Sequence, residues 1–277
     1  IILLIFTLHS GVVKSQTYLD PDAPVEMRVS DLLSRMTLEE KVGQMTQADH
    51  TAINDPTHIQ SFFLGSILSG GGSDPIAGNN PTHWADLYDD LQGQALQTRL
   101  QIPLIYGIDA VHGHSNVTGA VIFPHNIGLG ATRNPDLIQQ ANRITAIEIA
   151  ATGIDWTFAP CIAVPRDERW GRTYEGFGET PELAELFGGA AIRGLQNDSL
   201  NTPTSIAACA KHYIGDGGTQ FGIDQGNTVV SEAELRAIHL PGYIEAIEND
   251  VKTIMASYNS WNGEKIHGHQ YLLTDVL

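Results

Sequence analysis

The chain has 277 residues, of which 42% are hydrophobic, and this is enough apolar material for the core of one large domain. Its formal net charge of −17 argues against nucleic acid as a partner, because phosphate contacts need concentrated Lys and Arg side chains. The acidic balance is compatible with a neutral substrate such as a sugar, and equally with plain solubility.

The N-terminal segment is an apolar run from Ile1 to Val13, which is too short to span a membrane. Its length and the small and polar residues that follow it match the hydrophobic part of a secretory signal. We therefore expect residues 1–16 to be a signal-peptide remnant and the protein to be secreted or periplasmic. A buried N-terminal strand is the alternative interpretation.

Alternating helix and strand patterns follow in chain order. Residues 28–48 have the apolar spacing of a helix, with Asp31 placed as a cap and Thr37 and Glu40 placed as a capping box. The next segments read as a strand at 62–68, a helix at 81–100, a strand at 104–109, a helix at 135–152, a strand at 156–164, a helix at 181–195, a strand at 206–214, a helix at 231–249 and a strand at 253–258.

This alternation is typical of a parallel α/β fold. The polar residues gather after the strands, where barrel enzymes hold their sites, so we expect a (β/α)8 domain of the TIM-barrel type. Five predicted strands are fewer than the eight that close such a barrel, and the pattern stops inside what reads as another helix. The prediction is therefore a barrel that is incomplete at its C-terminus.

Clustered polar side chains stand at the ends of three predicted strands. Asp109 follows the strand at 104–109, the segment 166–172 follows the strand at 156–164, and Lys211 and His212 end an apolar run. Burial of unpaired charge is costly, whereas polar groups on rigid elements can meet a polar ligand in fixed geometry. We expect these side chains to form one shared site.

Five segments resemble motifs of glycoside hydrolase family 3, the β-glucosidases and exo-β-glucanases. They are Tyr106–His114 (YGIDAVHGH), Phe123–Thr132 (FPHNIGLGAT), Arg169–Glu175 (RWGRTYE), Ala210–Thr219 (AKHYIGDGGT) and Ser257–Gly263 (SYNSWNG). The resemblance runs from about residue 25 to the end. It implies that residues 25–277 are the family's N-terminal barrel domain.

The resemblance implies which residues bind the substrate, a β-glucoside or a β-glucan oligosaccharide. Asp109, Arg172, Lys211 and His212 occupy the family's positions for gripping the non-reducing glucose unit, and Tyr258 matches a residue beside the reactive carbon. The chemistry agrees, because a carboxylate accepts hydrogen bonds from sugar hydroxyls while Arg, Lys and His donate them. No cofactor is implied.

The resemblance also implies hydrolysis of terminal non-reducing β-D-glucosyl residues with retention of configuration, by an Asp nucleophile and a Glu acid. Neither carboxylate is found here: the nucleophile's Ser-Asp-Trp motif is expected shortly beyond Leu277, and the Glu in a second, C-terminal α/β domain. We expect these 277 residues by themselves to bind sugar without turning it over. Asp216 stands where the β-N-acetylglucosaminidase branch has a catalytic His, which favours the glucosidase branch.

Lys211 and His212 are adjacent on a predicted strand, and successive strand side chains point to opposite faces. Both can enter one pocket only at a bulge or at the end of the strand. Lys211 could instead be a structural residue that is paired with Asp109 or Asp216. The two other acids near the motifs, Asp216 and Glu175, are expected to bond backbone amides, as acids in glycine-rich turns usually do.

Two other functions stay open. His112 and His114 form a His-x-His pattern, which in barrels can begin the metal site of a metal-dependent hydrolase. We expect these two side chains to bond loop backbone near Asp109 instead. A catalytically dead sugar-binding remnant is the non-enzymatic alternative.

Cys161 and Cys209 lie in apolar runs and read as buried free thiols, although an exported protein could join them in a disulfide.

Overall fold

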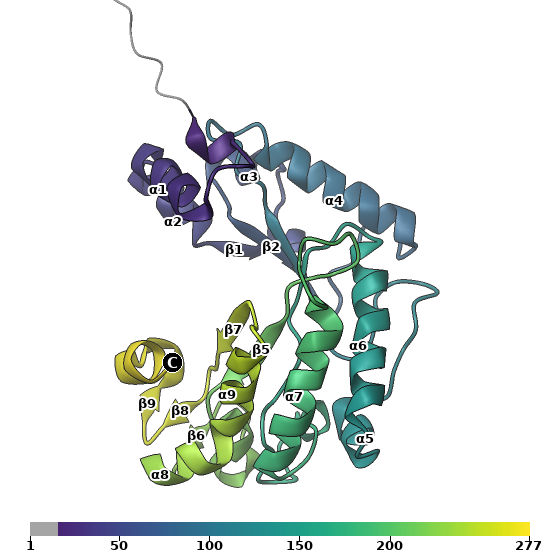
Figure 1. Ribbon diagram of the computed structural model, residues 1–277, viewed down its shortest axis with the longest axis vertical. Coiled ribbons are helices and arrows are strands. Elements are labelled where there is room, and N and C mark those ends of the chain that lie inside the picture. Colours follow the sequence, from purple (N-terminus) through teal and green to yellow (C-terminus); the bar gives the residue numbers. More distant parts are fainter. Residues whose placement is uncertain (1–15) are drawn as a thin grey trace, which may run out of the picture.

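The computed structural model describes residues 16–277, so the predicted signal segment lies outside the described residues except for its last residue. Parallel strands form one series across the molecule (Figure 1). They are β1 (Gln47–Asp49), β2 (Ser66–Ser69), β3 (Ile105–Ile108), β4 (Trp156–Thr157), β5 (Cys209–Tyr213) and β7 (Thr253–Ala256). β1 to β4 pair in chain order, and β5 pairs with β7. Parallel bridges from Trp156 to Ala207 and from Cys161 to Lys211 connect the two groups.

Helices alternate with these strands. They are α1 (Val25–Arg35), α2 (Leu38–Gln44), α3 (Thr57–Ser61), α4 (Pro81–Ala95), α5 (Asn126–Ala131), α6 (Pro135–Ala150), α7 (Pro181–Gln196), α8 (Glu232–Glu234) and α9 (Pro241–Glu248). Figure 1 shows α6, α7 and α9 side by side as one layer. A small separate sheet contains β6 (Asn227–Thr228), β8 (Ser260–Trp261) and β9 (Glu264–Lys265).

The helix starts follow from local sequence. α4, α6, α7 and α9 each begin with a proline, whose fixed φ suits the first helical turn and whose missing N–H would have no partner there. Thr37 caps α2 in the predicted capping box: its side chain accepts from the Glu40 amide at 3.2 Å, and Glu40 accepts from the Thr37 amide at 2.8 Å.

Two helix predictions were wrong in detail. The helix expected over 28–48 is two helices, because Met36 is extended and lets Thr37 cap the second; Asp31 lies inside α1 and bonds Arg35 instead of capping. The helix expected over 231–249 is interrupted by a π-helical turn at 235–239, and α9 starts afresh at Pro241, whose ring cannot continue the preceding helix.

The five predicted strands are confirmed in order and direction, with narrower bounds, while β1 and the short strands β6, β8 and β9 were missed. β1 lies where the end of the first long helix was expected, and the strand expected to begin at Phe62 begins at Ser66. Both errors fall on short segments, in which too few residues are present to tell the helix period from the strand period. Within residues 16–277, β1 and β7 are the edges of the parallel series, and no pairing joins them.

The core lies between the strands and the helices that cover them. Its largest fully buried side chains include Ile67 of β2, Ile108 of β3, Ile149 of α6 and Phe187 of α7. This layer fixes the strands from which the polar side chains of the site project.

Gly130 in α5 is in close contact with the loop that leads to α7. A Cβ at this position would overlap the carbonyl oxygen of Phe177. We expect Gly130→Ala to lower the free energy of unfolding by about 1–3 kcal/mol or more, because a backbone carbonyl cannot rotate away as a side chain can. The matched control is Gly93→Ala in α4, where a Cβ meets nothing within 4 Å and stability should rise by about 0.4–1 kcal/mol. Urea unfolding of both variants gives the comparison, and equal midpoints would contradict this prediction.

Candidate functional site

A cavity of about 260 Å³ opens at the carboxyl ends of β3, β5 and β7. All five predicted sugar-binding residues line it: Asp109, Arg172, Lys211, His212 and Tyr258. Asp109 follows β3, Lys211 and His212 end β5, and Tyr258 follows β7. The structure therefore brings together side chains that are separated by up to about 150 residues, while their roles in binding stay a prediction.

Lys211 and Asp109 form the ion pair of this cavity. The Lys211 ammonium lies 2.7 Å from an Asp109 carboxylate oxygen. The Lys211 side chain is only 3% exposed, whereas 44% of the Asp109 side chain is accessible. Of the two partners that the sequence left open for Lys211, Asp109 forms the ion pair and Asp216 does not. Because the carboxylate keeps an accessible face, the pair can still accept hydrogen bonds from a ligand.

A bulge lets adjacent residues of β5 both reach the cavity. The register of β5 against β7 shifts between Lys211 and Tyr213, which breaks the simple alternation of side-chain direction. His212 and Lys211 consequently line the same cavity, as the sequence requires for a shared site.

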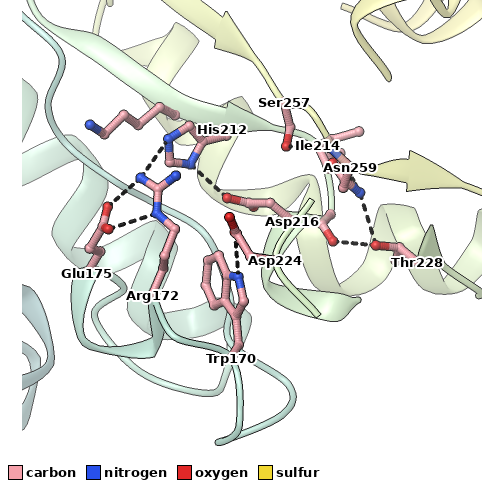
Figure 2. Close-up of polar contacts among 12 residues, drawn as sticks. Trp170, Arg172, Glu175, His212, Ile214, Asp216, Asp224, Thr228, Ser257 and Asn259 are labelled. Carbon is pink, nitrogen blue, oxygen red and sulfur yellow. Dashed lines mark hydrogen bonds and ion pairs between the residues drawn. The ribbon is translucent and has the colours of Figure 1, made fainter. Parts of the chain in front are cut away.

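A second chain of polar contacts runs through His212 (Figure 2). The Nδ1 atom of His212 lies 2.7 Å from Asp216 Oδ2, and its Nε2 atom lies 3.0 Å from Arg172 Nη2. Glu175 holds Arg172 through two hydrogen bonds of 2.8 Å, to Nε and Nη2. Burial opposes the charge on Arg172, but the hydrogen bonds and ion pair with Glu175 outweigh it and raise the pKa of the guanidinium.

The expected partners of Asp216 and Glu175 were wrong. Both carboxylates bond side chains of the site and not backbone amides. For Asp216 the reason is the turn at Gly215, whose φ of 87° needs glycine and returns the chain beneath the end of β5. A sequence pattern cannot show which side chain lies across such a turn.

Other residues of the cavity were missed by sequence reasoning. Asp224 and Gln225 reach it from the loop after β5, and Phe158, Met255, Ala256 and Ser257 also line it. Trp170 is buried, and its indole N–H donates to Asp224 at 3.3 Å (Figure 2). This hydrogen bond connects the segment after β4 with the loop after β5. Only the position of Asp224 and Gln225 in a loop after a site-bearing strand could have indicated them.

The two histidines after β3 have different partners. His112 bonds the Phe123 carbonyl at 2.9 Å, which confirms the expected contact with loop backbone. His114 is buried and bonds the Thr152 hydroxyl at 3.0 Å, so the same expectation was wrong for it. Burial lowers the pKa of His114 to about 4. Within residues 16–277, no group of three or more His, Cys, Asp or Glu side chains is placed to hold a metal ion.

Both cysteines are buried free thiols, as expected. Burial is the largest cause that raises the pKa of Cys161 to about 12. Neither thiol is therefore a candidate nucleophile.

A larger cavity of about 550 Å³ lies away from this site, along α4 and the loops after β1 and β2. Most of its lining is apolar, and no ion pair spans it among the described residues. Paired, convergent charges at strand ends make the smaller cavity the better candidate for a polar ligand.

Parallel strands, covering helices and a cavity lined by polar residues at the strand ends are the features of a TIM-barrel-like α/β domain. Residues 37–277 match the model of the glycosyl hydrolase family 3 N terminal domain, and the chain belongs to this family. The predicted family and fold class are confirmed.

Among curated relatives, a lysosomal beta glucosidase of Dictyostelium discoideum is 36% identical over 272 residues, which cover 90% of this chain and 33% of the relative. A periplasmic beta-glucosidase of Salmonella typhimurium is 30% identical, over 90% of this chain and 31% of the relative. The chain spans about a third of the length of these relatives.

Among solved structures, the exo-1,3/1,4-beta-glucanase ExoP of a Pseudoalteromonas species has a TM-score of 0.87 and 45% identity, over 95% of this chain and 34% of that one. A beta-glucosidase of Listeria innocua in complex with glucose has a TM-score of 0.79 and 28% identity, over 91% and 35%.

Proposed function

We propose that the full-length protein is a β-glucosidase or exo-β-glucanase and that this domain forms the glucose-binding half of its active site. The observation that carries the proposal is the cavity in which Asp109, Lys211 and Arg172 converge from separate strand ends. A glucose unit offers a ring of hydroxyls, each both donor and acceptor, and these charged groups can form strong hydrogen bonds with it. The names of the relatives and the glucose complex of the Listeria enzyme support this assignment.

The proposed chemistry is retaining hydrolysis. A carboxylate attacks the anomeric carbon, a carboxylic acid protonates the leaving oxygen, and water then hydrolyses the glycosyl-enzyme. We assign neither role to this chain, since Glu175 and Asp216 are held by Arg172 and His212. We propose that both catalytic carboxylates belong to parts of the full-length enzyme outside these residues, the acid to a C-terminal α/β domain. The residues of this cavity orient the non-reducing unit for the attack.

The experiment is to express the full-length protein and to follow the products from cellobiose and laminaribiose by proton NMR. The proposal requires glucose release with the β-anomer formed first. The 277-residue chain, tested separately by calorimetry, should bind glucose without hydrolysing either disaccharide. A full-length protein that binds glucose and never cleaves would show the sugar-binding remnant instead.

A metal-dependent barrel hydrolase is the second candidate, because a His-x-His pattern follows β3. His112 and His114 bond different partners, a loop carbonyl and a buried hydroxyl. We therefore expect the glucosidase activity to be unchanged after dialysis against EDTA. A loss of activity that added Zn²⁺ restores would favour the metal-dependent class.

For the organisation of the chain, we propose a signal remnant at residues 1–16, a barrel domain at 25–277, and export to the periplasm or the medium. The family match from residue 37 and the periplasmic relatives of Salmonella and Dickeya support this. Within the described part of the chain, no helix is long and apolar enough to cross a membrane. N-terminal sequencing of the protein recovered from the culture medium or periplasm tests the cleavage.

A further inference from the structure

Two buried carboxylates, Asp216 in the cavity wall and Glu175 behind Arg172, have no assigned part in binding or chemistry. Asp216 is 7% exposed, Glu175 is 9% exposed, and each is bonded to a residue proposed to bind glucose. We infer that both are positioning residues: Asp216 fixes the tautomer of His212, and Glu175 with His212 fixes the plane of Arg172. This inference rests on the proposed function and concerns how the same site recognises the sugar.

The partners of His212 determine where its proton lies. An ionised carboxylate can only accept, so the Nδ1 atom that faces Asp216 carries the hydrogen. A guanidinium can only donate, so the Nε2 atom that faces Arg172 is the unprotonated acceptor. Only the neutral tautomer with its proton on Nδ1 satisfies both contacts. His212 therefore accepts from Arg172 and offers no N–H of its own to the sugar.

The partners of Arg172 determine which donor remains for a ligand. Glu175 takes Nε and one hydrogen of Nη2, and His212 takes the other hydrogen of Nη2. Within residues 16–277 no hydrogen bond engages Nη1, which leaves its two N–H groups for sugar hydroxyls. The predicted direct donor role of His212 is thus replaced by an indirect one, in which His212 acts through Arg172.

Without Asp216 the imidazole is free to take the other tautomer. Its Nε2–H would then face the Arg172 N–H, and two donors would repel each other at a distance of 3.0 Å. Arg172 would lose one of the contacts that hold its plane. Figure 2 shows this series of contacts, from Glu175 through Arg172 and His212 to Asp216.

The test is a double-mutant cycle on kcat/KM of the full-length protein with 4-nitrophenyl β-glucoside. We expect Asp216→Leu to lower kcat/KM by about 10- to 100-fold, the effect of one charge-assisted hydrogen bond. Asp216→Asn keeps a carbonyl that accepts from Nδ1–H and should retain at least about a tenth of the activity. In a His212→Phe background, Asp216→Leu should have no further effect, because its action passes through the imidazole.

A structural role gives different results. The losses of kcat/KM caused by Asp216→Leu and His212→Phe would then multiply in the double variant, or Asp216→Asn would lower kcat/KM as much as Asp216→Leu. Either result overturns the inference. Thr152→Val is the matched control, since it breaks a hydrogen bond to buried His114 outside the cavity and should leave kcat/KM unchanged. Thermal unfolding identifies any variant that does not fold, and Glu175→Gln then gives a second cycle with Arg172→Met. If the wild-type protein binds glucose without cleaving glucosides, the proposed hydrolytic activity is wrong but the positioning inference is not. The same double-mutant cycle is then measured on the affinity for glucose.

Discussion

Replacement of Lys211 by Ala in the full-length protein is expected to lower kcat/KM for β-glucosides by about 100- to 1,000-fold. The ammonium is almost fully buried and lies 2.7 Å from Asp109, so its removal leaves a carboxylate of the sugar site without its counter-charge. A hydrogen bond to a charged group contributes about 1.5–3 kcal/mol, and about 1.4 kcal/mol corresponds to a factor of ten. The substitution removes the bond to Asp109 together with any that the ammonium donates to the sugar.

The matched control for this substitution is Lys252→Ala. Lys252 also forms an ion pair with an aspartate, Asp250, but both side chains are exposed and lie outside the cavity. Exposed pairs contribute little, so kcat/KM should stay within about twofold of the wild-type value. Steady-state kinetics of the two variants decide the assignment. A near-normal kcat/KM for Lys211→Ala would exclude Lys211 from the substrate site.

Asp109→Asn is expected to weaken glucose binding by about 100-fold or more. The amide has nearly the shape of the carboxylate, so packing is preserved, but the buried Lys211 loses its counter-charge and the sugar loses an ionised acceptor. Isothermal titration with glucose measures the effect directly, and it does so whether or not the protein cleaves glucosides. The measurement therefore separates the sugar site from the hydrolytic chemistry.

Asp250→Asn is the corresponding control, because it neutralises the exposed partner of Lys252. It should leave glucose affinity unchanged. Equal affinities for wild type and Asp109→Asn would mean that the sugar does not bind at the end of β3, and the cavity would then need another ligand.

Local sequence sufficed for most of the fold. The capping box at Thr37 and the prolines that open α4, α6 and α7 act between near neighbours, and the structure has these helix starts where the pattern predicts. The alternation of strands and helices likewise gave the α/β class, because periodicity depends only on which faces are buried. Where periodicity is ambiguous, at β1 and around Pro241, the predictions were wrong.

The candidate site was likewise predictable in its residue types and not in its contacts. The residue types at the strand ends indicate a polar site, and the motifs indicate a sugar ligand. The contacts between those residues were not predictable from the chain. The pair of Lys211 with Asp109 joins residues 102 positions apart, and the bulge in β5 depends on how that strand pairs with β7.

By itself, the sequence determined the family, the α/β class and five of the residues that line the cavity, because motifs and periodicity are properties of short segments. Only the tertiary structure decided which polar groups meet, and hence that Lys211 pairs with Asp109 and that His212 lies against Arg172. The physical reason is that hydrogen bonding acts over about 3 Å, so partners are fixed by the packing of strands and turns that bring distant segments together.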